Sequence, residues 1–428
     1  MIPALVQWEI TDRCPYRCPY CYHEGLKGAA PAALGLDEEQ VWQVAKIISD
    51  NHLFFVTFTG GEPLVRKDLL IELAKFLRCN GVVVSLNTSL AVFDEETLSR
   101  LKVDRMLISC PSADDRLYRQ TTGNGQYEHF KQRLRWLIEA GQNMTVNMVV
   151  TKLNRDVVRQ TAQRMAELGV KRFAATPASI NASNPNFKLL LSVQEVCQVV
   201  DDLIWAHEEL GLRVDIMESI PKCLMPLKAF ELELPFVFRS CHAGKRNGTI
   251  GTQGDVRPCS HNPQIFGNVL EDDIGVIWDR MRNWREASGN FHKDCLACDM
   301  FNNCGGGCRI DANVRMGSNN AKHPYMTKSL SSPVVKPKQV DLSPTSTIKP
   351  VRSFQSRPEN GGWLVAPGSP RNIIQVNQAT YDFLTASRGL PAMSISGLAQ
   401  RFGTTFNDVE FQRVVTELTR RQFFIVGN

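Results

Sequence analysis

Three cysteines near the N-terminus have a spacing suited to an iron-sulfur cluster. Cys14, Cys18 and Cys21 form a C-x3-C-x2-C arrangement directly after a predicted strand, Ala4 to Thr11. Three thiolates on one loop can cap three irons of a cubane, whereas Cys-ligated zinc and ordinary ferredoxin clusters take a fourth protein ligand. The spacing therefore predicts a cluster with one open iron. The alternative is a zinc knuckle or a group of buried thiols.

A second motif follows another predicted strand. Leu53 to Thr59 is mostly apolar, and Gly60, Gly61, Glu62 and Pro63 come directly after it. Glycines allow a backbone to approach a ligand closely, and a carboxylate is a natural partner for an ammonium group. Taken alone, this motif would be an ordinary turn between a strand and a helix.

Together the two motifs resemble those of the radical SAM superfamily. The resemblance implies that the three cysteines hold a 4Fe-4S cluster whose open iron binds S-adenosylmethionine, abbreviated SAM. It also implies that Tyr20 lies against the adenine of SAM. The turn from Gly60 to Pro63 would receive the amino group of the methionine moiety, with Glu62 as a SAM contact. No side chain is predicted to be a catalytic acid or base.

Three further residues are candidates for contacts with SAM. Asn87 and Ser109 end predicted strands where relatives often contact the methionine carboxylate or the ribose, and ordinary capping is an equal alternative for each. Arg119 could supply a cation for the carboxylate. Residues 109–112 depart from the Ser-Leu-Asp-Gly of many relatives, which leaves the local contacts open.

The elements that position these motifs alternate along the chain from Ala4 to about Leu210. Further strands are predicted at Leu53 to Thr59, Val82 to Thr88, Val103 to Ser109, Met144 to Thr151 and Arg172 to Thr176. Helices are predicted at Asp37 to Asp50, Lys67 to Arg78, Tyr127 to Ala140, Arg155 to Leu168 and Val193 to Leu210. Such alternation favours an α/β fold with a parallel sheet. The resemblance makes it a partial (β/α)6 TIM-like barrel, in which chemistry gathers at the C-terminal ends of the strands.

A second cysteine array follows the barrel. Its members are Cys241, Cys259, Cys295, Cys298, Cys304 and Cys308. Their spacing resembles the SPASM extension, which implies two auxiliary 4Fe-4S clusters; a zinc ribbon is the alternative. By the family's usual wiring, Cys241, Cys259 and Cys308 would serve the first auxiliary cluster and the other three the second. The glycine-rich stretch 247–254 is predicted to form a hairpin.

The second auxiliary cluster lacks its usual fourth ligand. Met326 stands where the family has a seventh cysteine, and a thioether is a poor substitute for a thiolate. Asp299, Asp311, His323, an exogenous thiol or the substrate are the alternatives. Cys223 could complete the first auxiliary cluster or could be a plain buried thiol.

A third module follows a change in composition. Residues 327–350 are rich in Ser, Pro, Lys and Thr and are predicted to form a linker. Strands are then predicted at Phe354 to Arg357, Trp363 to Ala366 and Asn372 to Val376, helices at Gln378 to Ala386, Ile395 to Phe402 and Asp408 to Arg421, and a closing segment at Phe423 to Val426. This order predicts a winged-helix-like α+β domain over 351–428. The predicted domains before it are the barrel, 1–215, and the SPASM domain, 216–326.

This last module resembles PqqD, the leader-peptide chaperone of pyrroloquinoline quinone biosynthesis. The resemblance rests on Gly361-Gly362-Trp363, on Val376-Asn377-x3-Tyr381 and on Leu418 to Ile425. It implies recognition of a precursor peptide through its leader segment. An exposed edge strand near 371–376 could accept the leader by β-addition. A DNA-binding winged helix is the alternative, but the helix at 395–402 offers one arginine.

Composition excludes several classes of protein. The chain has 428 residues, a net charge of +5 and 13 cysteines. Its length predicts two or three domains. No apolar run approaches a membrane span and no signal peptide precedes the first strand, so we expect a cytoplasmic protein with no membrane partner. Without a Lys/Arg block, no nucleic-acid partner is expected. The cysteines occur in clusters typical of ligands, so a reducing compartment is favoured over a disulfide scaffold.

The combined prediction is a radical SAM/SPASM peptide maturase. Reduced by a flavodoxin or ferredoxin, it would generate a 5′-deoxyadenosyl radical that abstracts hydrogen from a ribosomally made precursor peptide. The product would be a carbon-carbon, carbon-oxygen or thioether cross-link, or an excised backbone. The alternatives are a maturase of a folded protein, similar to sulfatase maturases, and an iron-sulfur regulator that binds DNA.

Overall fold

The computed structural model describes residues 2–23, 35–179, 186–286, 288–327 and 342–427. The chain divides into two compact units, Ile2–Val335 and Lys336–Asn428. Each has its own hydrophobic core, and each is described by itself.

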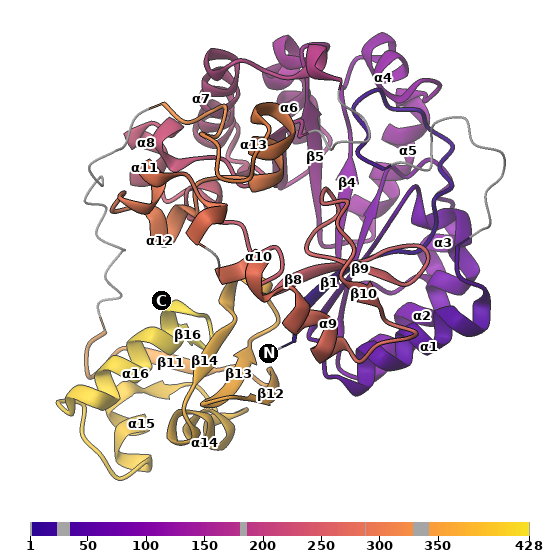
Figure 1. Cartoon of the computed structure of the whole chain (residues 1–428). Coiled ribbons are helices and arrows are strands. Elements are labelled where there is room, and N and C mark those ends of the chain that lie inside the picture. The colour runs from indigo at the N-terminus through magenta and orange to yellow at the C-terminus, as the bar shows by residue number, and fades with distance from the viewer. Residues whose placement is uncertain (1, 24–34, 180–185, 287, 328–341, 428) are drawn as a thin grey trace. The chain divides into compact units, whose positions relative to one another are not determined.

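The N-terminal unit is built on one ten-stranded sheet (Figure 1). Its parallel part contains β1 (Leu5–Glu9), β2 (Phe55–Thr59), β3 (Val83–Thr88), β4 (Arg105–Ser109), β5 (Met144–Val150), β6 (Arg172–Pro177) and β7 (Arg213–Asp215). Each of these strands pairs in parallel with the next along the chain. The predicted parallel sheet is thereby confirmed, and the short strand β7 extends it beyond the six predicted units.

Helices connect these strands and cover the outer face of the sheet (Figure 1). They are α1 (Glu38–Asp50), α2 (Lys67–Cys79), α3 (Glu95–Arg100), α4 (Asp115–Thr122), α5 (Tyr127–Glu139), α6 (Val158–Glu167) and α7 (Val193–Leu210). The five predicted helices are confirmed within a few residues. The sequence prediction missed α3 and α4, because each is too short to show a clear helical period.

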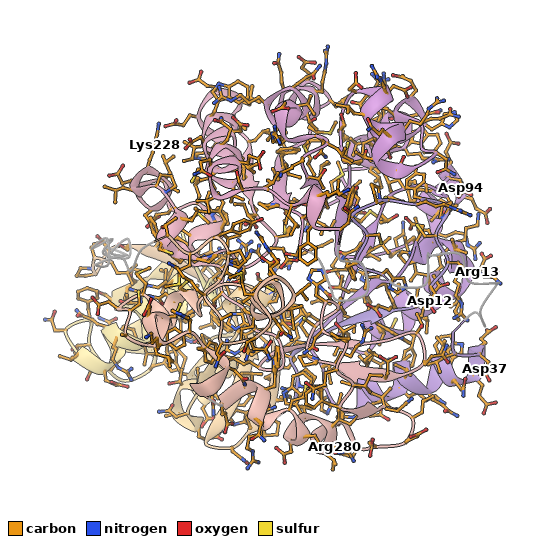
Figure 2. The ribbon with its side chains drawn as sticks, turned by 45° about the horizontal axis from the view of Figure 1, so that its top comes forward. Asp12, Arg13, Asp37, Asp94, Lys228 and Arg280 are labelled. Atoms are coloured by element: carbon orange, nitrogen blue, oxygen red, sulfur yellow. The ribbon has the colours of Figure 1, made fainter. Side chains whose placement is uncertain are left out.

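Side-chain caps fix where several of these helices begin. Asp37 accepts a hydrogen bond from the Gln40 amide at the start of α1, and Asp94 accepts one from the Thr97 amide at the start of α3. A capping side chain satisfies an amide that would otherwise lack a partner at the first turn. Figure 2 shows both aspartates on the outside of the N-terminal unit.

The segment after the barrel continues the same sheet. Strand β8 (Asn247–Ile250) pairs in parallel with β1, and β9 (Asp255–Arg257) and β10 (Gly267–Asn268) follow in antiparallel order. The predicted hairpin before Cys259 is confirmed. The remaining helices of the unit are α8 (Leu227–Glu231), α9 (Ile274–Arg280), α10 (Arg282–Glu286), α11 (Lys293–Leu296), α12 (Phe301–Cys304) and α13 (Arg309–Met316). Because β8 hydrogen-bonds to β1, the two predicted N-terminal domains share one sheet.

The C-terminal unit contains two small antiparallel sheets and three helices. One sheet has the order β15 (Met393–Ser394), β11 (Thr347–Pro350) and β16 (Phe424–Val426), and the other has the order β12 (Gln355–Glu359), β13 (Gly362–Ala366) and β14 (Ile374–Val376). The helices are α14 (Gln378–Ser387), α15 (Ile395–Arg401) and α16 (Val409–Arg420). The predicted elements are therefore present, whereas their assignment as a winged helix stays a prediction.

The predicted linker ends earlier than the sequence suggested. Strand β11 lies inside the predicted range 327–350 and is the central strand of its sheet. Its Ile348 is fully buried in the core of the C-terminal unit. Ser, Pro and Thr dominate this stretch and concealed a strand whose buried residues are Ile348 and Pro350. Residues 328–341 of the predicted linker lie outside the described residues.

None of the helices in the described ranges combines the length and the apolar composition needed to cross a membrane.

Candidate metal centres

The first cysteine set lies on the loop that follows β1. The Cys14 thiol accepts a hydrogen bond from the Tyr16 amide at 3.4 Å, and the Cys21 amide donates to the Cys18 carbonyl at 3.1 Å. Burial raises the pKa of Cys14 and of Cys18 to about 12, and the neighbouring thiols of the set add to both shifts. Ionising these thiols is costly, because they are largely buried and the resulting thiolates repel one another. Bound iron would offset this cost, so the loop suits a metal cluster.

The two glycines of the second motif are required by the cysteine loop itself. A β-carbon on Gly60 would lie 2.4 Å from the Thr11 carbonyl oxygen, and one on Gly61 would lie 2.3 Å from the Arg13 carbonyl oxygen. The Gly61 amide donates to the Thr11 carbonyl at 2.7 Å, and the Glu62 amide donates to the Arg13 carbonyl at 2.8 Å. The turn after β2 therefore packs backbone to backbone against the segment that leads into Cys14. The sequence analysis had ascribed the glycines to the approach of a ligand.

Glu62 is buried and fully engaged with the end of β3. Its carboxylate accepts hydrogen bonds from the Thr88 hydroxyl at 2.7 Å, the Ser89 amide at 2.8 Å and the Ser89 hydroxyl at 2.5 Å. The Leu64 amide donates to it at 3.2 Å. Burial raises the pKa of Glu62, and these hydrogen bonds oppose the shift. Glu62 thus ties the turn after β2 to the end of β3.

The other predicted SAM contacts lie in different surroundings. The Tyr20 side chain is half-buried beside Cys18, and burial raises the pKa of its phenol. Asn87 lies on β3 and Ser109 on β4, and both are half-buried. Along each strand half-buried residues alternate with buried ones, and these two side chains lie on the half-buried face. Arg119 lies on α4 with a 61% exposed side chain that pairs with Asp115 at 3.8 Å. Their predicted roles toward SAM stay predictions.

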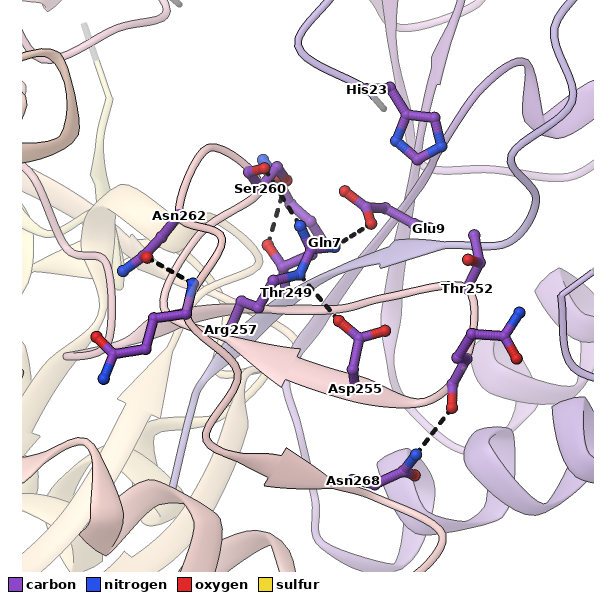
Figure 3. A network of polar contacts seen from close by, with 12 residues as sticks. Gln7, Glu9, His23, Thr249, Thr252, Asp255, Arg257, Ser260, Asn262 and Asn268 are labelled. Atoms are coloured by element: carbon purple, nitrogen blue, oxygen red, sulfur yellow. Dashed lines mark hydrogen bonds and ion pairs between the residues drawn. The ribbon is translucent and has the colours of Figure 1, made fainter. Parts of the chain in front are cut away.

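A charged network beside the cysteine loop was missed by the sequence analysis (Figure 3). Glu9, 2% exposed at the end of β1, forms an ion pair with Arg257 of β9. Arg257 also pairs with Asp255 at 3.0 Å. On the other side of Glu9, His23 pairs with Asp12 at 2.7 Å. A glutamate at the end of a buried apolar strand was the available signal, since charged residues are rarely buried without a partner.

The first auxiliary set is Cys241, Cys259 and Cys308, and the Cys308 side chain caps the start of α13. Burial raises the pKa of Cys259 to about 12, with the charge of Cys241 as the next cause. Burial also raises the pKa of Cys308 strongly, and the charges of Glu218 and of the two other cysteines add to the shift. The charges of these thiols thus raise one another's pKa, and the sequence prediction that they share one cluster stays a prediction.

The second auxiliary set lines one cavity with a fourth thiol. The cavity is bordered by Pro221, Lys222, Cys223, Asp294, Cys295, Cys298, Met300, Phe301, Cys304, Gly306 and Met326. Burial is the largest cause that raises the pKa of Cys295 to about 11. The charges of Cys304, Cys223 and Cys298 also raise this pKa, with effects that decrease in that order. The sequence analysis proposed Cys223 as a ligand of the first auxiliary set. In the structure Cys223 instead borders the cavity of the second set.

The carboxylate and imidazole alternatives for the second set do not border this cavity, but His323 borders a second cavity together with Cys295 and Cys308. Asp311 and His323 are both buried and face each other, with Oδ2 and Nε2 3.4 Å apart, and the Asp311 amide donates to the Cys308 thiol at 3.5 Å. Asp299 is exposed and does not border the cavity. No group of three His, Cys, Asp or Glu side chains among the described residues converges as it would on a single metal ion.

Comparison with protein families and known proteins supports this interpretation of the cysteine sets. The model of the Radical SAM superfamily matches residues 8–181, and the model of the SPASM iron-sulfur cluster-binding domain matches residues 241–299. The first match includes the cysteine loop and the glycine turn, and the second begins at Cys241.

Curated relatives carry several different names. A PqqA peptide cyclase of Bradyrhizobium diazoefficiens is 27% identical over 73% of this chain and 82% of the relative. A subtilosin biosynthesis protein of Bacillus subtilis, AlbA, is 23% identical over 71% of this chain and 67% of the relative. An AdoMet-dependent heme synthase of Oleidesulfovibrio alaskensis is 24% identical over 76% of this chain and 87% of the relative.

Two solved structures share the fold. Native anSMEcpe with bound AdoMet superposes with a TM-score of 0.60 at 17% identity, over 75% of this chain and 94% of that one. Streptococcus suis SuiB bound to its precursor peptide SuiA superposes with a TM-score of 0.59 at 16% identity, over 75% of each chain. The radical SAM TIM-like fold with a SPASM domain is thereby confirmed.

The protein is a radical SAM enzyme. It uses S-adenosylmethionine and a 4Fe-4S cluster, together with auxiliary iron-sulfur clusters. The donor sets fit these groups, because each consists of buried or half-buried free thiols and thiolate is the ligand that holds iron-sulfur clusters.

Proposed function

We propose that the enzyme modifies a ribosomally made precursor peptide, and that its C-terminal unit binds the leader segment of that peptide. The observation that carries the proposal is the edge strand β14 of the C-terminal unit. In its three-stranded sheet, β14 pairs with β13 alone and so leaves one edge for another strand. A peptide can add to such an edge through main-chain hydrogen bonds.

The opposite edge of that sheet is less suited to strand addition. Strand β12 contains Pro358, which has no amide hydrogen to donate to a ladder. Strand β14, Ile-Gln-Val, keeps all three amides. Ile374 and Val376 pack against the core of the C-terminal unit, and Gln375 is exposed. The strand is thus anchored on one face and accessible along its backbone.

The C-terminal unit also has a charge suited to an acidic partner. From Lys349 onward it carries nine Lys/Arg against five Asp/Glu. Glu359, Glu410 and Glu417 are already paired with arginines of the same unit. Electrostatic attraction mainly speeds encounter and selects partners. An acidic leader would therefore be favoured over a basic one.

The names of the relatives support a peptide substrate only in combination with the C-terminal unit. A peptide cyclase and a bacteriocin biosynthesis protein are among them, and SuiB was crystallised with its precursor peptide. Heme synthases are among them as well, so the N-terminal unit alone does not select the substrate. We assign the C-terminal unit as a PqqD-type, winged-helix-like recognition domain, and this assignment favours the peptide.

Within the proposal, the residues of the chain hold the reacting groups. Cys14, Cys18 and Cys21 would ligate the SAM-binding cluster, with Tyr20 at the adenine and the turn from Gly60 to Pro63 at the methionine amino group. When bound and reduced, this cluster supplies an electron that cleaves SAM to methionine and a 5′-deoxyadenosyl radical able to abstract hydrogen. A leader held by the C-terminal unit raises the effective concentration of the core peptide, so the core needs little affinity of its own.

The proposal also includes a flavodoxin or ferredoxin as reductant and a cytoplasmic location. No disulfide joins any of the 13 cysteines, all of which lie in the described residues, and disulfides are rare in the cytoplasm. Of the two alternatives, the DNA-binding regulator is set aside because the protein is a radical SAM enzyme. Action on a folded protein is not favoured, because the relatives include proteins named for peptide substrates.

Co-expression of the full chain with a candidate precursor peptide tests the proposal. Mass spectrometry of the peptide should show a loss of about two mass units for each cross-link, or a larger loss for backbone excision. The same peptide without its leader should stay unmodified. If reduced enzyme forms 5′-deoxyadenosine with a tetrapyrrole but with no leader-bearing peptide, the proposed substrate class is wrong.

A further inference from the structure

The cavity of the second auxiliary set is bordered by a cysteine from outside the predicted array. Four thiols border one cavity of the N-terminal unit: Cys223, Cys295, Cys298 and Cys304. Three of them belong to the predicted array, whereas Cys223 precedes that array by many residues. It lies on a short 3-10 helix, Lys222–Leu224, just before α8.

Two hydrogen bonds hold this helix against the array. The Lys222 amide donates to the Cys304 thiol at 3.3 Å, so the chain enters Cys223 in direct contact with a member of the set. The Cys223 carbonyl accepts a hydrogen bond from the Thr327 hydroxyl at 2.9 Å. Thr327 directly follows Met326, the residue that replaces the family's seventh cysteine. Cys223 and Met326 therefore border one cavity from adjoining segments of the chain.

Met326 borders the same cavity but is a weaker ligand. Its sulfur lies 3.7 Å from the Cys295 sulfur, and the side chain is 9% exposed. A thioether carries no charge, and iron-sulfur clusters are held by thiolates. Asp294, the carboxylate that borders the cavity, has a 49% exposed side chain that lies 3.7 Å from His292. Among the cavity residues, Cys223 is thus the one additional thiol.

A buried cation beside the set agrees with four thiolate ligands. Lys222 is 1% exposed, and its ammonium group donates to the Phe236 carbonyl at 2.6 Å. Burying a charge is costly unless an opposite charge compensates for it. A cluster with four thiolates carries net negative charge and would provide that compensation.

We propose that Cys223, together with Cys295, Cys298 and Cys304, holds the second auxiliary 4Fe-4S cluster. This cluster is then fully ligated by protein thiolates. The inference concerns ligation and holds for any substrate of the enzyme.

Site-directed variants of the full chain test this ligand set. The background is a variant with Cys14, Cys18 and Cys21 all changed to Ala, so that only auxiliary clusters contribute to the spectra. In this background Cys223→Ala should lose about four irons per chain, or convert one cluster to a three-iron form detectable by electron paramagnetic resonance. Cys298→Ala should behave in the same way. The exposed thiol of Cys79, changed to Ser, is the matched control and should leave iron content and spectra unchanged.

Cysteine labelling in the unmodified protein gives a second readout that does not depend on the folding of a variant. In anaerobically prepared holoenzyme, Cys223 should resist alkylation together with Cys295, while Cys79 reacts. After the iron is removed by a chelator, Cys223 should become reactive, as measured by peptide mass spectrometry. Rapid alkylation of Cys223 in fully loaded enzyme, or Cys223→Ala with the iron content and spectra of the control, would overturn the proposal.

Discussion

A β-carbon on Gly61 would lie 2.3 Å from the Arg13 carbonyl oxygen, because the turn after β2 and the cysteine loop pack backbone to backbone. Hydrogen bonds on both sides of this contact fix the path of the chain into Cys14. The glycine turn and the cysteine motif are therefore one structural unit, although they are distant in sequence. A change in the turn should be detected first at the cluster.

Gly61→Ala should prevent the cysteine loop from reaching its position. A contact well below 3.0 Å with backbone atoms forces the loop to shift, at a cost of about 1–3 kcal/mol. We expect a lower thermal midpoint and loss of the SAM-binding cluster, measured as iron per chain. Gly289→Ala is the control, because a β-carbon there meets no atom within 4 Å. Wild-type iron content and midpoint in Gly61→Ala would contradict this account.

Glu62→Gln should destabilise the enzyme by about 1–3 kcal/mol. Glutamine replaces one carboxylate oxygen by an amide nitrogen that cannot accept, so either the bonds that Ser89 donates to Oε2 or those that the Thr88 hydroxyl and the Leu64 amide donate to Oε1 are lost. Thermal unfolding measures the loss, and Ser89→Ala should give a smaller one. A Glu62→Gln enzyme of unchanged stability but weaker SAM binding would instead assign the carboxylate to SAM alone.

The Glu9 carboxyl should make stability depend on pH. Burial raises the pKa of Glu9 from its ordinary value of 4.5, and Arg257 and His23 only partly oppose this shift. The folded state then binds the proton more tightly than the unfolded state, so stability falls as pH rises from 4.5 through the raised value. Glu9→Gln lacks this titration, so the wild type should lose stability relative to the variant as pH rises.

Thermal midpoints of the wild type and Glu9→Gln between about pH 5 and about pH 8 measure this difference. Glu9→Gln also loses the ion pair with Arg257, which shifts its whole curve of thermal midpoint against pH. The slopes of the two curves are therefore compared, because such a shift does not change a slope. Glu95→Gln, at an exposed helix position, controls for the exchange of a carboxyl group for an amide in itself. Parallel curves for Glu9→Gln and the wild type would show that Glu9 does not titrate in this range.

Gln375→Pro should weaken leader binding at least about tenfold if the leader adds to β14, because proline removes an amide from the strand. Gln375→Ala keeps the amide and removes only an exposed side chain, so it should bind the leader as the wild type does. Fluorescence anisotropy of a labelled leader with the full chain measures both affinities. Peptide-independent SAM cleavage should be the same in all three proteins. Equal affinities would place the leader elsewhere.

Local sequence pattern was sufficient for most elements of the fold. Apolar runs predicted β2 to β6, and helical periodicity predicted α1, α2, α5, α6 and α7, because each of these elements is long enough to show its period. The strand β11 was placed in a linker, because its Pro and Thr content outweighed the alternation of buried Ile348 and Pro350 with exposed neighbours. Short elements held by tertiary contacts carry little local signal.

By itself, the sequence determined which chemistry the chain can hold. Ligand type and spacing within a loop are local properties, so the first three cysteines and the glycine turn could be identified from the residues, whereas the division of the later cysteines into two sets rested on their resemblance to SPASM domains. Only the tertiary structure decided which distant residues meet. Glu9 and Arg257 are 248 residues apart, and Lys222 and Cys304 are 82 apart. These long-range contacts depend on the pairing of β8 with β1 and on the packing of the segment before α8 against the cysteine array. No local sequence pattern predicts this packing.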